Sequence, residues 1–323
     1  MTQPAVNKPL VIQTEDLDTE PASWLAERCE LVRCGQDEPE FGSLLARASG
    51  LVVRTYTQVT AEMLASAPNL RVVARAGVGV DNIDLESCWA RGIVVLSTPG
   101  ANTRAVVEYV FAAIFDALRP RVYLHEALDQ SRWNATRKSL EAPRQLADCT
   151  LGIWGMGRIG SQVARAAAAL DMRVVYHDLC EIDDALRFGA EPLGRDEMLA
   201  RADIVTVHID GRKTNYRVVD ASAFARMKPD VVFINSSRGV VVDPVACAEF
   251  CVDHPEATAI LDVHDPEPVA ETSPLLEIAN VHLSPHIAGG TRAAKLEMSW
   301  VVRDVWRVLS GEAPEHPVLP SSP

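Results

Sequence analysis

The chain is built from short apolar runs that alternate with Ala- and Leu-rich stretches of helical character. Many of these runs are apolar and β-branched at consecutive positions, as expected of strands that are covered on both faces. The alternation of strand and helix predicts an α/β protein with doubly wound parallel sheets. The predicted strands are 10–13, 50–53, 71–74, 93–96, 151–154, 173–177, 203–207, 231–235, 259–263 and 281–284. The predicted helices between them include 61–66, 159–170, 195–200 and 246–250.

The predicted strands fall into two groups, one before about residue 100 and one from 151 to about 284. A long predicted helix, 103–118, separates the two groups. The segment 132–149 is polar and has no clean periodicity, so we expect it to include a loop. After His286 the pattern predicts one more helix, 293–309, and then a Pro-rich tail. A chain of 323 residues is long enough for two such domains.

Charge and composition narrow the class of protein. The formal net charge is −13 at pH 7, which disfavours a surface for nucleic acid or anionic membranes. A small anionic substrate stays possible, because a local pair of Arg residues can outweigh the global charge. We see no secretory signal at the N-terminus and no apolar run long enough to cross a bilayer. The seven cysteines include no CxxC pair, which indicates reduced thiols in a cytoplasmic protein without a metal site.

A glycine-rich loop follows the predicted strand 151–154 and precedes a predicted helix. Gly155, Gly157 and Gly160 give it the pattern Gly-x-Gly-x-x-Gly. The first glycine allows a tight turn, the second lets the backbone approach a pyrophosphate, and the third lets the helix pack close to the strand. The helix N-terminus then offers free N–H groups and its positive dipole end to the phosphates. The loop therefore indicates a dinucleotide-binding site.

An acidic residue, Asp178, stands at the end of the next predicted strand. A carboxylate at this place can accept hydrogen bonds from ribose hydroxyls and repel a 2′-phosphate. No Arg follows Asp178 directly, so the sequence favours NAD over NADP as the cofactor. The alternative is a structural glycine turn with a surface carboxylate.

Three polar residues late in the chain stand at the ends of predicted strands: Arg238, Glu267 and His286. Ligands of open α/β sheets bind outside the carboxyl ends of the strands. An Arg, a Glu and a His also form the set needed for hydride transfer at a hydroxy acid. The His takes the hydroxyl proton, the Glu orients the His and favours its charged form, and the Arg binds the substrate carboxylate or carbonyl. Spacing alone leaves open that each of them is a structural or surface residue.

Several long motifs in one order identify the family that the chain resembles. The motifs are GVGVDNID at 77–84, STPGANT at 97–103, GMGRIG at 155–160, INSSRG at 234–239, LDVHDPEP at 261–268 and SPHIAG at 284–289. With them the chain resembles the D-isomer-specific 2-hydroxyacid dehydrogenase family over almost its whole length. The resemblance implies an NAD-dependent enzyme that acts on a small 2-hydroxy or 2-oxo acid.

The resemblance also assigns roles to individual residues. The Val78–Gly79 backbone corresponds to the family's carboxylate-binding loop, and Asn102 to a residue that lines the substrate cleft. The implied catalytic residues are Arg238, Glu267 and His286. The implied cofactor contacts, beside the three loop glycines and Asp178, are Arg158, Ile159, His208, Ile209, Ser236, Ser237, Asp262 and Gly289.

The architecture that the resemblance implies has two domains. A flavodoxin-like substrate-binding domain would consist of residues 1–102 and 291–323, and a Rossmann NAD-binding domain, 103–290, would be inserted into it. The helices 103–118 and 293–309 would link the domains, and the site would lie in a cleft that closes on binding. The family is usually dimeric through the cofactor domain, so we expect a homodimer.

The first half of the chain resembles the phosphoglycerate dehydrogenase branch, in the segments 53–60 and 73–82. In that branch an Arg at the position of Arg54 contacts the substrate phosphate, and Arg75 would add positive charge. This implies oxidation of 3-phosphoglycerate to 3-phosphohydroxypyruvate, a step of serine biosynthesis. The alternative is that Arg54 has a structural role at a strand end and pairs with a nearby acid.

The chain also departs from the family pattern. The segment 134–149 replaces the usual sequence after Trp133 and belongs either to the site or to the dimer surface. His208 is not followed by Thr-Pro-Leu, which leaves the contacts of Ile209 and Asp210 open. We expect no regulatory domain, and therefore no serine feedback through one.

Two other functions stay open. One is a glyoxylate or hydroxypyruvate reductase, or another D-2-hydroxyacid dehydrogenase. The other is an NAD(H)-sensing binding protein, similar to the C-terminal-binding transcriptional corepressors, because these retain the Arg, Glu and His.

Overall fold

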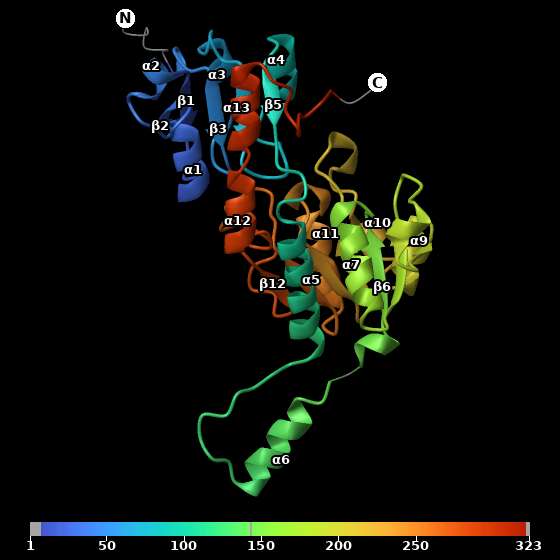
Figure 1. Ribbon diagram of the computed structural model, residues 1–323. Coiled ribbons are helices and arrows are strands. Elements are labelled where there is room, and N and C mark those ends of the chain that lie inside the picture. The colour runs from blue at the N-terminus through green and yellow to red at the C-terminus, as the bar shows by residue number, and fades with distance from the viewer. Residues whose placement is uncertain (1–7, 143, 321–323) are drawn as a thin grey trace, which may run out of the picture. The chain divides into compact units, whose positions relative to one another are not determined.

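The computed structural model describes residues 8–142 and 144–320 of the chain. The chain divides into two compact units (Figure 1). The split unit consists of Met1–Asn102 and Gly290–Pro323, and the inserted unit consists of Thr103–Gly289. The second boundary lies one residue before the one that the sequence suggested.

The split unit contains a five-stranded parallel sheet in the order β2-β1-β3-β4-β5. This is the flavodoxin-like order, so the fold class predicted for the first part of the chain is confirmed. The strands are β1 (Leu10–Gln13), β2 (Glu30–Arg33), β3 (Gly50–Val53), β4 (Val72–Arg75) and β5 (Val94–Leu96). The helices are α1 (Thr19–Ala26), α2 (Phe41–Leu45), α3 (Ala61–Ala65), α4 (Leu85–Ala90), α12 (Arg292–Ser299) and α13 (Val302–Ser310).

Helices cover both faces of this sheet because successive strand residues point to opposite sides. Val11 and Val52 belong to an apolar core that includes side chains of α1 and α13. Their strand neighbours Ile12 and Val53 belong to the opposite core, with side chains of α2, α3 and α4. The uninterrupted apolar runs of the sequence are thus explained by burial on both faces.

The predicted helix 293–309 is two helices in the structure, α12 and α13, with turn residues between them. Ser299 ends α12, and its hydroxyl donates to the carbonyl oxygen of Lys295 at 2.8 Å. The same hydroxyl accepts the backbone N–H of Asp18 at 3.1 Å. Such a serine bond to the preceding turn competes with the helix and bends it. The apolar periodicity continues across the break, so the sequence pattern did not reveal it.

The inserted unit contains a seven-stranded parallel sheet in the order β12-β11-β10-β9-β6-β7-β8. The order reverses between β6 and β9, and ligands of doubly wound sheets bind at such a reversal. The strands are β6 (Thr150–Trp154), β7 (Arg173–His177), β8 (Glu191–Pro192), β9 (Ile204–Val207), β10 (Val232–Asn235), β11 (Thr258–Leu261) and β12 (Val281–Leu283). The helices are α5 (Thr103–Leu118), α6 (Gln130–Ser139), α7 (Arg158–Ala168), α8 (Asp184–Arg187), α9 (Arg195–Arg201), α10 (Ala221–Phe224) and α11 (Pro244–Asp253).

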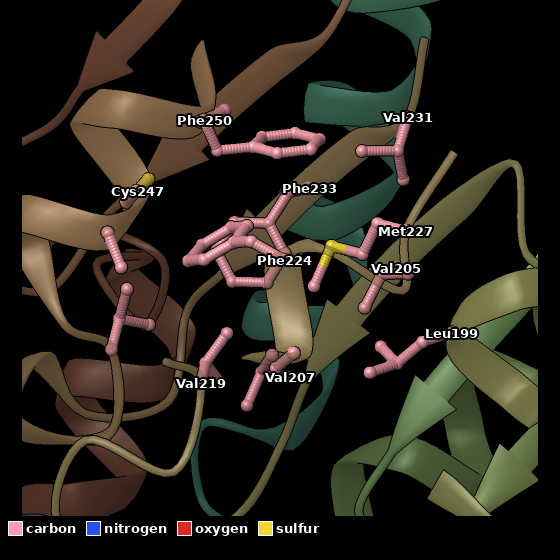
Figure 2. Close-up of a cluster of buried hydrophobic side chains, with 14 of the residues drawn as sticks. Leu199, Val205, Val207, Val219, Phe224, Met227, Val231, Phe233, Cys247 and Phe250 are labelled. Atoms are coloured by element: carbon pink, nitrogen blue, oxygen red, sulfur yellow. The ribbon is translucent and has the colours of Figure 1, made fainter. Parts of the chain in front are cut away.

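A cluster of buried apolar side chains, which includes three phenylalanines, fills the core on one face of the seven-stranded sheet (Figure 2). The ring of Phe224 lies edge-on to Phe233, with centroids 5.2 Å apart, and is stacked on Phe250 at 5.3 Å. Burial of each ring stabilises the fold by about 2–3 kcal/mol. Helices α5 and α7 contribute to the core of the opposite face. The strands that carry the candidate site are therefore fixed from both sides.

Two strands were missed from the sequence, β2 and β8. Both are at an edge of their sheet, and their residues are exposed or half-buried. Charged residues begin both strands, so neither gives an uninterrupted apolar run. Edge strands of this kind carry little periodic signal.

The segment predicted to include a loop, 132–149, contains most of a helix, α6. Asp129 caps this helix by accepting the N–H of Arg132 at 2.8 Å. None of its residues is buried, so the helix has no apolar face and the sequence shows no periodicity there.

In the described part of the chain, we find no helix with both the length and the apolar character of a membrane span.

The seven cysteines all lie among the described residues and carry free thiols. Cys180 is exposed, and the other six are buried. Burial raises the pKa of the Cys29 and Cys88 thiols to about 11.

Candidate active site

The glycine loop between β6 and α7 has the geometry that its sequence indicated. Gly155 has φ +99°, and a β-carbon there would lie 2.8 Å from the carbonyl oxygen of His208. A β-carbon on Gly160 would lie 2.2 Å from the carbonyl oxygen of Gly155. These two glycines are therefore required by the turn and by the close packing of α7 on it.

Gly157 differs from the other two loop glycines. No heavy atom lies within 4 Å of the position that its β-carbon would take, so the space above the loop is open. Gly157 is the N-cap of α7, and no side chain caps the helix there. The first N–H groups of α7, from Arg158 onward, are therefore available to a phosphate. Ile159 is half-buried and packs against the core of the unit.

Asp178, at the end of β7, is tied to the glycine loop. Its Oδ2 accepts the N–H of Met156 at 2.6 Å, and its Oδ1 accepts the N–H of Cys180 at 2.9 Å. Each carboxylate oxygen has a second lone pair. The carboxylate can therefore fix the loop and still accept a ribose hydroxyl.

Two buried polar atoms at the ends of neighbouring strands have no hydrogen-bond partner among the described residues: Nδ1 of His208, after β9, and Oγ of Ser236, after β10. Burial lowers the pKa of His208 to about 3, so the ring is neutral at pH 7. Its other nitrogen, Nε2, is 3.0 Å from Oγ1 of Thr206. Unsatisfied buried polar atoms at the strand ends of the sheet that carries the open glycine loop fit a polar ligand such as a dinucleotide. Ile209 lies against the same loop, with its Cγ2 2.9 Å from the β-carbon position of Gly155.

His286 and Glu267 form a hydrogen-bonded pair. Nδ1 of His286 is 2.8 Å from Oε2 of Glu267. The other carboxylate oxygen, Oε1, accepts the N–H of His264 at 3.0 Å. Burial acts to raise the pKa of Glu267, but the bonds from His286 and His264 outweigh it, so the pKa lies below its usual range. The carboxylate is therefore charged at neutral pH and accepts the Nδ1–H of His286.

The backbone of His286 is in the left-handed region, with φ +54°. Its N–H donates to the carbonyl oxygens of Asp262 at 2.8 Å and of Ser284 at 3.0 Å. A residue other than glycine occupies this region at a cost, which the surrounding contacts must offset. Conformations of this kind are common at functional sites, because they aim a side chain in a fixed direction.

Asp262 supports the segment that carries His286. This side chain is fully buried, and its carboxylate accepts Oγ of Ser284 at 2.6 Å and the N–H groups of Ile287 at 2.8 Å and Ala288 at 2.7 Å. Oγ of Ser284 is also 2.6 Å from the hydroxyl of Tyr109 in α5. Three bonds to one segment give Asp262 a structural role that the sequence did not indicate. Gly289, the next residue after Ala288, ends the inserted unit.

The loop after β10 holds Arg238 and Ser237. Oδ1 of Asn235 accepts two hydrogen bonds from Ser237, from its N–H at 3.0 Å and from its hydroxyl at 2.8 Å. Nδ2 of Asn235 donates to the carbonyl oxygen of Arg238 at 2.9 Å. The Arg238 guanidinium donates through Nη1 to the carbonyl oxygen of Ser237 at 2.7 Å. Arg238 is half-buried in this position. Because β10 and β11 are neighbours, this loop and the Glu267 loop lie at the same sheet edge.

Two residues that matter to this site had no role in the sequence analysis. Gly239 follows Arg238, and its Cα packs directly on the backbone of His264. His264 bonds to Glu267 and also, through Nε2, to the carbonyl oxygen of Ser284 at 2.8 Å. Both residues lie inside motifs that we had identified, but only the structure reveals their contacts.

In the split unit, the carboxylate of Glu15 binds the loop after β3. Its oxygens accept the N–H groups of Arg54, Thr55, Tyr56 and Thr57 at distances from 2.9 to 3.3 Å. The guanidinium of Arg54 donates through Nη1 to the carbonyl oxygen of Asp16 at 3.1 Å. The acid thus contacts the backbone of Arg54, whereas the guanidinium bonds to a backbone carbonyl oxygen.

Arg75 braces the loops of the split unit. Its Nε donates to the carbonyl oxygen of Arg54 at 3.0 Å, and its Nη1 donates to the carbonyl oxygen of Gly79. These bonds hold the half-buried Val78–Gly79 backbone. Arg75 keeps its positive charge in these contacts, because both acceptors are neutral carbonyl oxygens.

Buried polar atoms without a partner among the described residues also occur in the split unit. They include Oδ1 of Asn102 and Oγ1 of Thr98, both in the motif 97–103. Thr98 had no role in the sequence analysis.

Near the C-terminus, Asp304, Glu315 and His316 have the spacing of metal ligands. The Asp304 carboxylate in that group already accepts bonds from Arg307 and from the backbone N–H groups of Glu315 and His316.

Comparison with known proteins identifies the family. Residues 111–288 match the family model described as D-isomer specific 2-hydroxyacid dehydrogenase, NAD binding domain. The chain is 35% identical to the (S)-sulfolactate dehydrogenase of Chromohalobacter salexigens, over 91% of this chain and 96% of that protein. The chain belongs to the D-isomer-specific 2-hydroxyacid dehydrogenase family. The resemblance inferred from the motifs is confirmed, and the inserted unit is its NAD-binding domain.

Two further relatives bear on the fold and on the substrate. The D-3-phosphoglycerate dehydrogenase of Archaeoglobus fulgidus is 34% identical over 84% of this chain, but the matched part is 51% of that protein. The chain thus spans about half the length of this relative. The crystal structure of the D-lactate dehydrogenase from Aquifex aeolicus, complexed with NAD and lactic acid, is similar with a TM-score of 0.81 and 25% identity, over 97% of this chain and 100% of that one.

Proposed function

We propose that this protein is an NAD-dependent oxidoreductase of D-2-hydroxy acids. The observation that carries the proposal is the 2.8 Å contact between Nδ1 of His286 and Oε2 of Glu267. With Nδ1 engaged, Nε2 of the exposed His286 ring is the nitrogen that faces a substrate. A histidine oriented by a carboxylate is suited to general acid–base catalysis.

In the oxidising direction, Nε2 of His286 takes the proton from the substrate hydroxyl. The Glu267 carboxylate stabilises the imidazolium that forms, because it is charged and hydrogen-bonded to Nδ1. NAD, when bound, accepts the hydride from the carbon that carries this hydroxyl. Arg238 binds the carboxylate or the carbonyl of the acid and stabilises negative charge that develops on its oxygen. In the reverse direction His286 returns the proton.

The cofactor is bound by the open glycine loop. Gly157 and the first N–H groups of α7 would hold the pyrophosphate, and Asp178 would accept hydroxyls of the adenosine ribose. Nδ1 of His208 and Oγ of Ser236 offer hydrogen bonds farther along the sheet edge. Ile209, Ser237, Asp262 and Gly289 complete the proposed set as lining or supporting residues.

The substrate carboxylate would bind to the Val78–Gly79 backbone that Arg75 braces, near Asn102. For the acid itself we propose 3-phosphoglycerate, with the phosphate at Arg54, in the serine-forming direction. Glu15 and Asp16 lie beside Arg54 and would oppose a second anion there. A 2-hydroxy acid without a phosphate, or glyoxylate or hydroxypyruvate as the 2-oxo substrate, is therefore the alternative.

A second copy of the chain is the proposed partner of the segment 119–141. No residue of this segment is buried. It also exposes large apolar side chains, namely Val122, Tyr123, Leu124 and Trp133. Apolar side chains gathered on one exposed segment are typical of a protein interface. A cytoplasmic homodimer, in which the buried thiols stay reduced, is consistent with these features.

Initial rates with NADH and three 2-oxo acids test the proposal: phosphohydroxypyruvate, hydroxypyruvate and glyoxylate. We expect turnover of at least one of them, and loss of that turnover in His286→Ala with NADH binding retained. If NADH binds but none of the acids is consumed, the protein is a binding protein and the enzymatic proposal is wrong. Preference among the acids, measured for the wild type and for Arg54→Ala, decides the substrate: unchanged use of phosphohydroxypyruvate by the variant excludes the phosphate site.

A further inference from the structure

His264 lies at the centre of the candidate site, in the loop after β11. In the sequence it lies between Asp262, which is fully buried, and Glu267. The His264 side chain is half-buried. Its contacts reach three segments: the Glu267 carboxylate, the segment that carries His286, and the loop that carries Arg238. No other role has been given to this side chain.

The imidazole of His264 shares an acceptor with the backbone of His286. Nε2 of His264 lies 2.8 Å from the carbonyl oxygen of Ser284, so this nitrogen carries the proton and donates. The N–H of His286 donates to the same oxygen at 3.0 Å. The His264 ring therefore fixes the carbonyl group around which the chain turns into the left-handed conformation of His286.

The backbone of His264 fixes the other half of the pair. Its N–H donates to Oε1 of Glu267 at 3.0 Å, which leaves Oε2 directed to Nδ1 of His286. The backbone itself is held in place by Gly239, since a β-carbon on Gly239 would lie 2.0 Å from the carbonyl carbon and oxygen of His264. His264 thus connects both Glu267 and the segment of His286 to the close backbone contact with Gly239.

We propose that His264 is a positioning residue for the proton relay, and that its ring N–H holds His286 in the orientation in which Nδ1 meets Glu267. This inference rests on the proposed function, because it assigns a role in the same reaction. A positioning role of His264 differs from a packing role in one respect. A packing role requires only the volume of the ring, whereas the positioning role requires a donor at the place of Nε2.

Two substitutions separate the donor from the volume. His264→Phe keeps a ring of similar size but has no donor, whereas His264→Gln places an amide N–H near the position of Nε2. The matched control is His282→Phe, at an exposed position of β12. Each variant is compared with the wild type in thermal unfolding, NADH affinity, kcat and KM, and the pH profile of kcat.

If the proposal is correct, His264→Phe lowers kcat by about 10- to 100-fold, a part of the roughly 10²- to 10⁴-fold that a positioned general acid or base contributes. NADH affinity and KM change much less, and the pH profile of kcat moves in the same direction as in Glu267→Gln. His264→Gln retains most of the activity and the wild-type profile. Retained kcat in His264→Phe with a loss in His264→Gln, or an unmoved profile in the Phe variant, would show that His264 only fills space.

A readout without turnover distinguishes this inference from the proposed function. The ring nitrogens of His286 are followed by nitrogen-15 NMR during a pH titration of the whole protein. We expect the titration midpoint of His286 to move in His264→Phe and to stay in place in His264→Gln and His282→Phe. If it does not move in His264→Phe, the positioning role is wrong, even if the enzyme is active. If it moves but no 2-oxo acid is consumed, the positioning role stands and the proposed reaction fails.

Discussion

The α-carbon of Gly239 packs directly on the backbone of His264, so closely that an added β-carbon would lie 2.0 Å from the carbonyl carbon and oxygen. These two residues belong to the loops after β10 and β11, which carry Arg238 and Glu267. Backbone atoms cannot move aside as the end of a flexible side chain can. The spacing of the two loops is therefore fixed by a glycine.

We expect Gly239→Ala to force the two loops apart. The added methyl group should destabilise the protein by about 1–3 kcal/mol, the range found for overpacked sites. It should also lower kcat, because Glu267 moves with its loop. Urea unfolding and initial rates measure the two effects. Gly194→Ala is the control, because its β-carbon would have no neighbour within 4 Å.

The glycines of the cofactor loop are expected to differ when each is replaced by Ala. Gly157→Ala adds a methyl group in open space, so the free energy of unfolding should change by less than about 1 kcal/mol. The methyl group would lie at the proposed pyrophosphate site, so the Kd for NADH should rise by about 10-fold or more, or about 1.4 kcal/mol. Fluorescence titration with NADH measures the affinity. An unchanged Kd would show that the cofactor does not approach this position.

Gly160→Ala provides the comparison, because its β-carbon would lie 2.2 Å from the carbonyl oxygen of Gly155. We expect this variant to lose about 1–3 kcal/mol of stability as well as NADH affinity. A variant that kept its full stability would contradict the close packing of α7 on the turn.

The pH dependence of the enzyme should change in Glu267→Gln. The pKa of Glu267 is below its usual range, so its carboxylate is charged across neutral pH and favours protonated His286. Reduction of a 2-oxo acid requires this proton, so removal of the charge should move the alkaline limb of the kcat profile to lower pH. Turnover at pH 7 should fall by about 10- to 100-fold, a part of the roughly 10²- to 10⁴-fold contribution of general acid–base catalysis. Glu271→Gln, at an exposed position, is the control, and an unmoved limb would argue against the pair.

Asp304 in α13 should contribute to stability in a pH-dependent way. Burial acts to raise its pKa, but the N–H groups of Glu315 and His316 and the guanidinium of Arg307 outweigh burial, and the pKa is lowered from 3.8. A group with a lowered pKa stabilises the fold above its unfolded value, and this contribution disappears as the pH falls through the folded value. We expect Asp304→Asn to lose about 2 kcal/mol at pH 7, as for hydrogen bonds to a charged group.

Below about pH 4, the unfolded value, the difference between Asp304→Asn and the wild type should shrink. Thermal unfolding of both proteins between pH 3 and about 7 checks this expectation. Asp37→Asn, an exposed carboxylate in the same unit, is the control. A difference that is constant with pH would mean that Asp304 acts through packing rather than through its charge.

The sequence predicted the strands where burial on two faces leaves a continuous apolar run. The predicted β1 agrees with the structure, and other central strands agree to within two residues. The sequence pattern did not predict β2 and β8, because an edge strand buries too few side chains to require apolar residues. It also failed for α6, a helix that has no buried face. Where no side chain is buried, periodicity gives no signal.

The candidate site was predictable at the level of motifs but not of contacts. Arg238, Glu267 and His286 could be proposed as catalytic residues because each follows a predicted strand, and the family resemblance then assigned their roles. The structural role of Asp262 could not be inferred, because it depends on bonds to a segment more than 20 residues away in the sequence. The role proposed for His264 depends on a bond to the same segment. Arg75 shows the same limit, since its charge is visible in the sequence and the backbone that it braces is not.

Cys180 has a consequence for the study of this protein. Among the described cysteines it is the one that solvent reaches, and its N–H is bound to the carboxylate of Asp178. A thiol reagent should therefore attach a fluorophore or a spin label at a single place without mutagenesis, beside the proposed ribose contact. If the adenosine ribose lies there, NAD should slow the labelling reaction. The rate of a simple alkylation then reports cofactor occupancy.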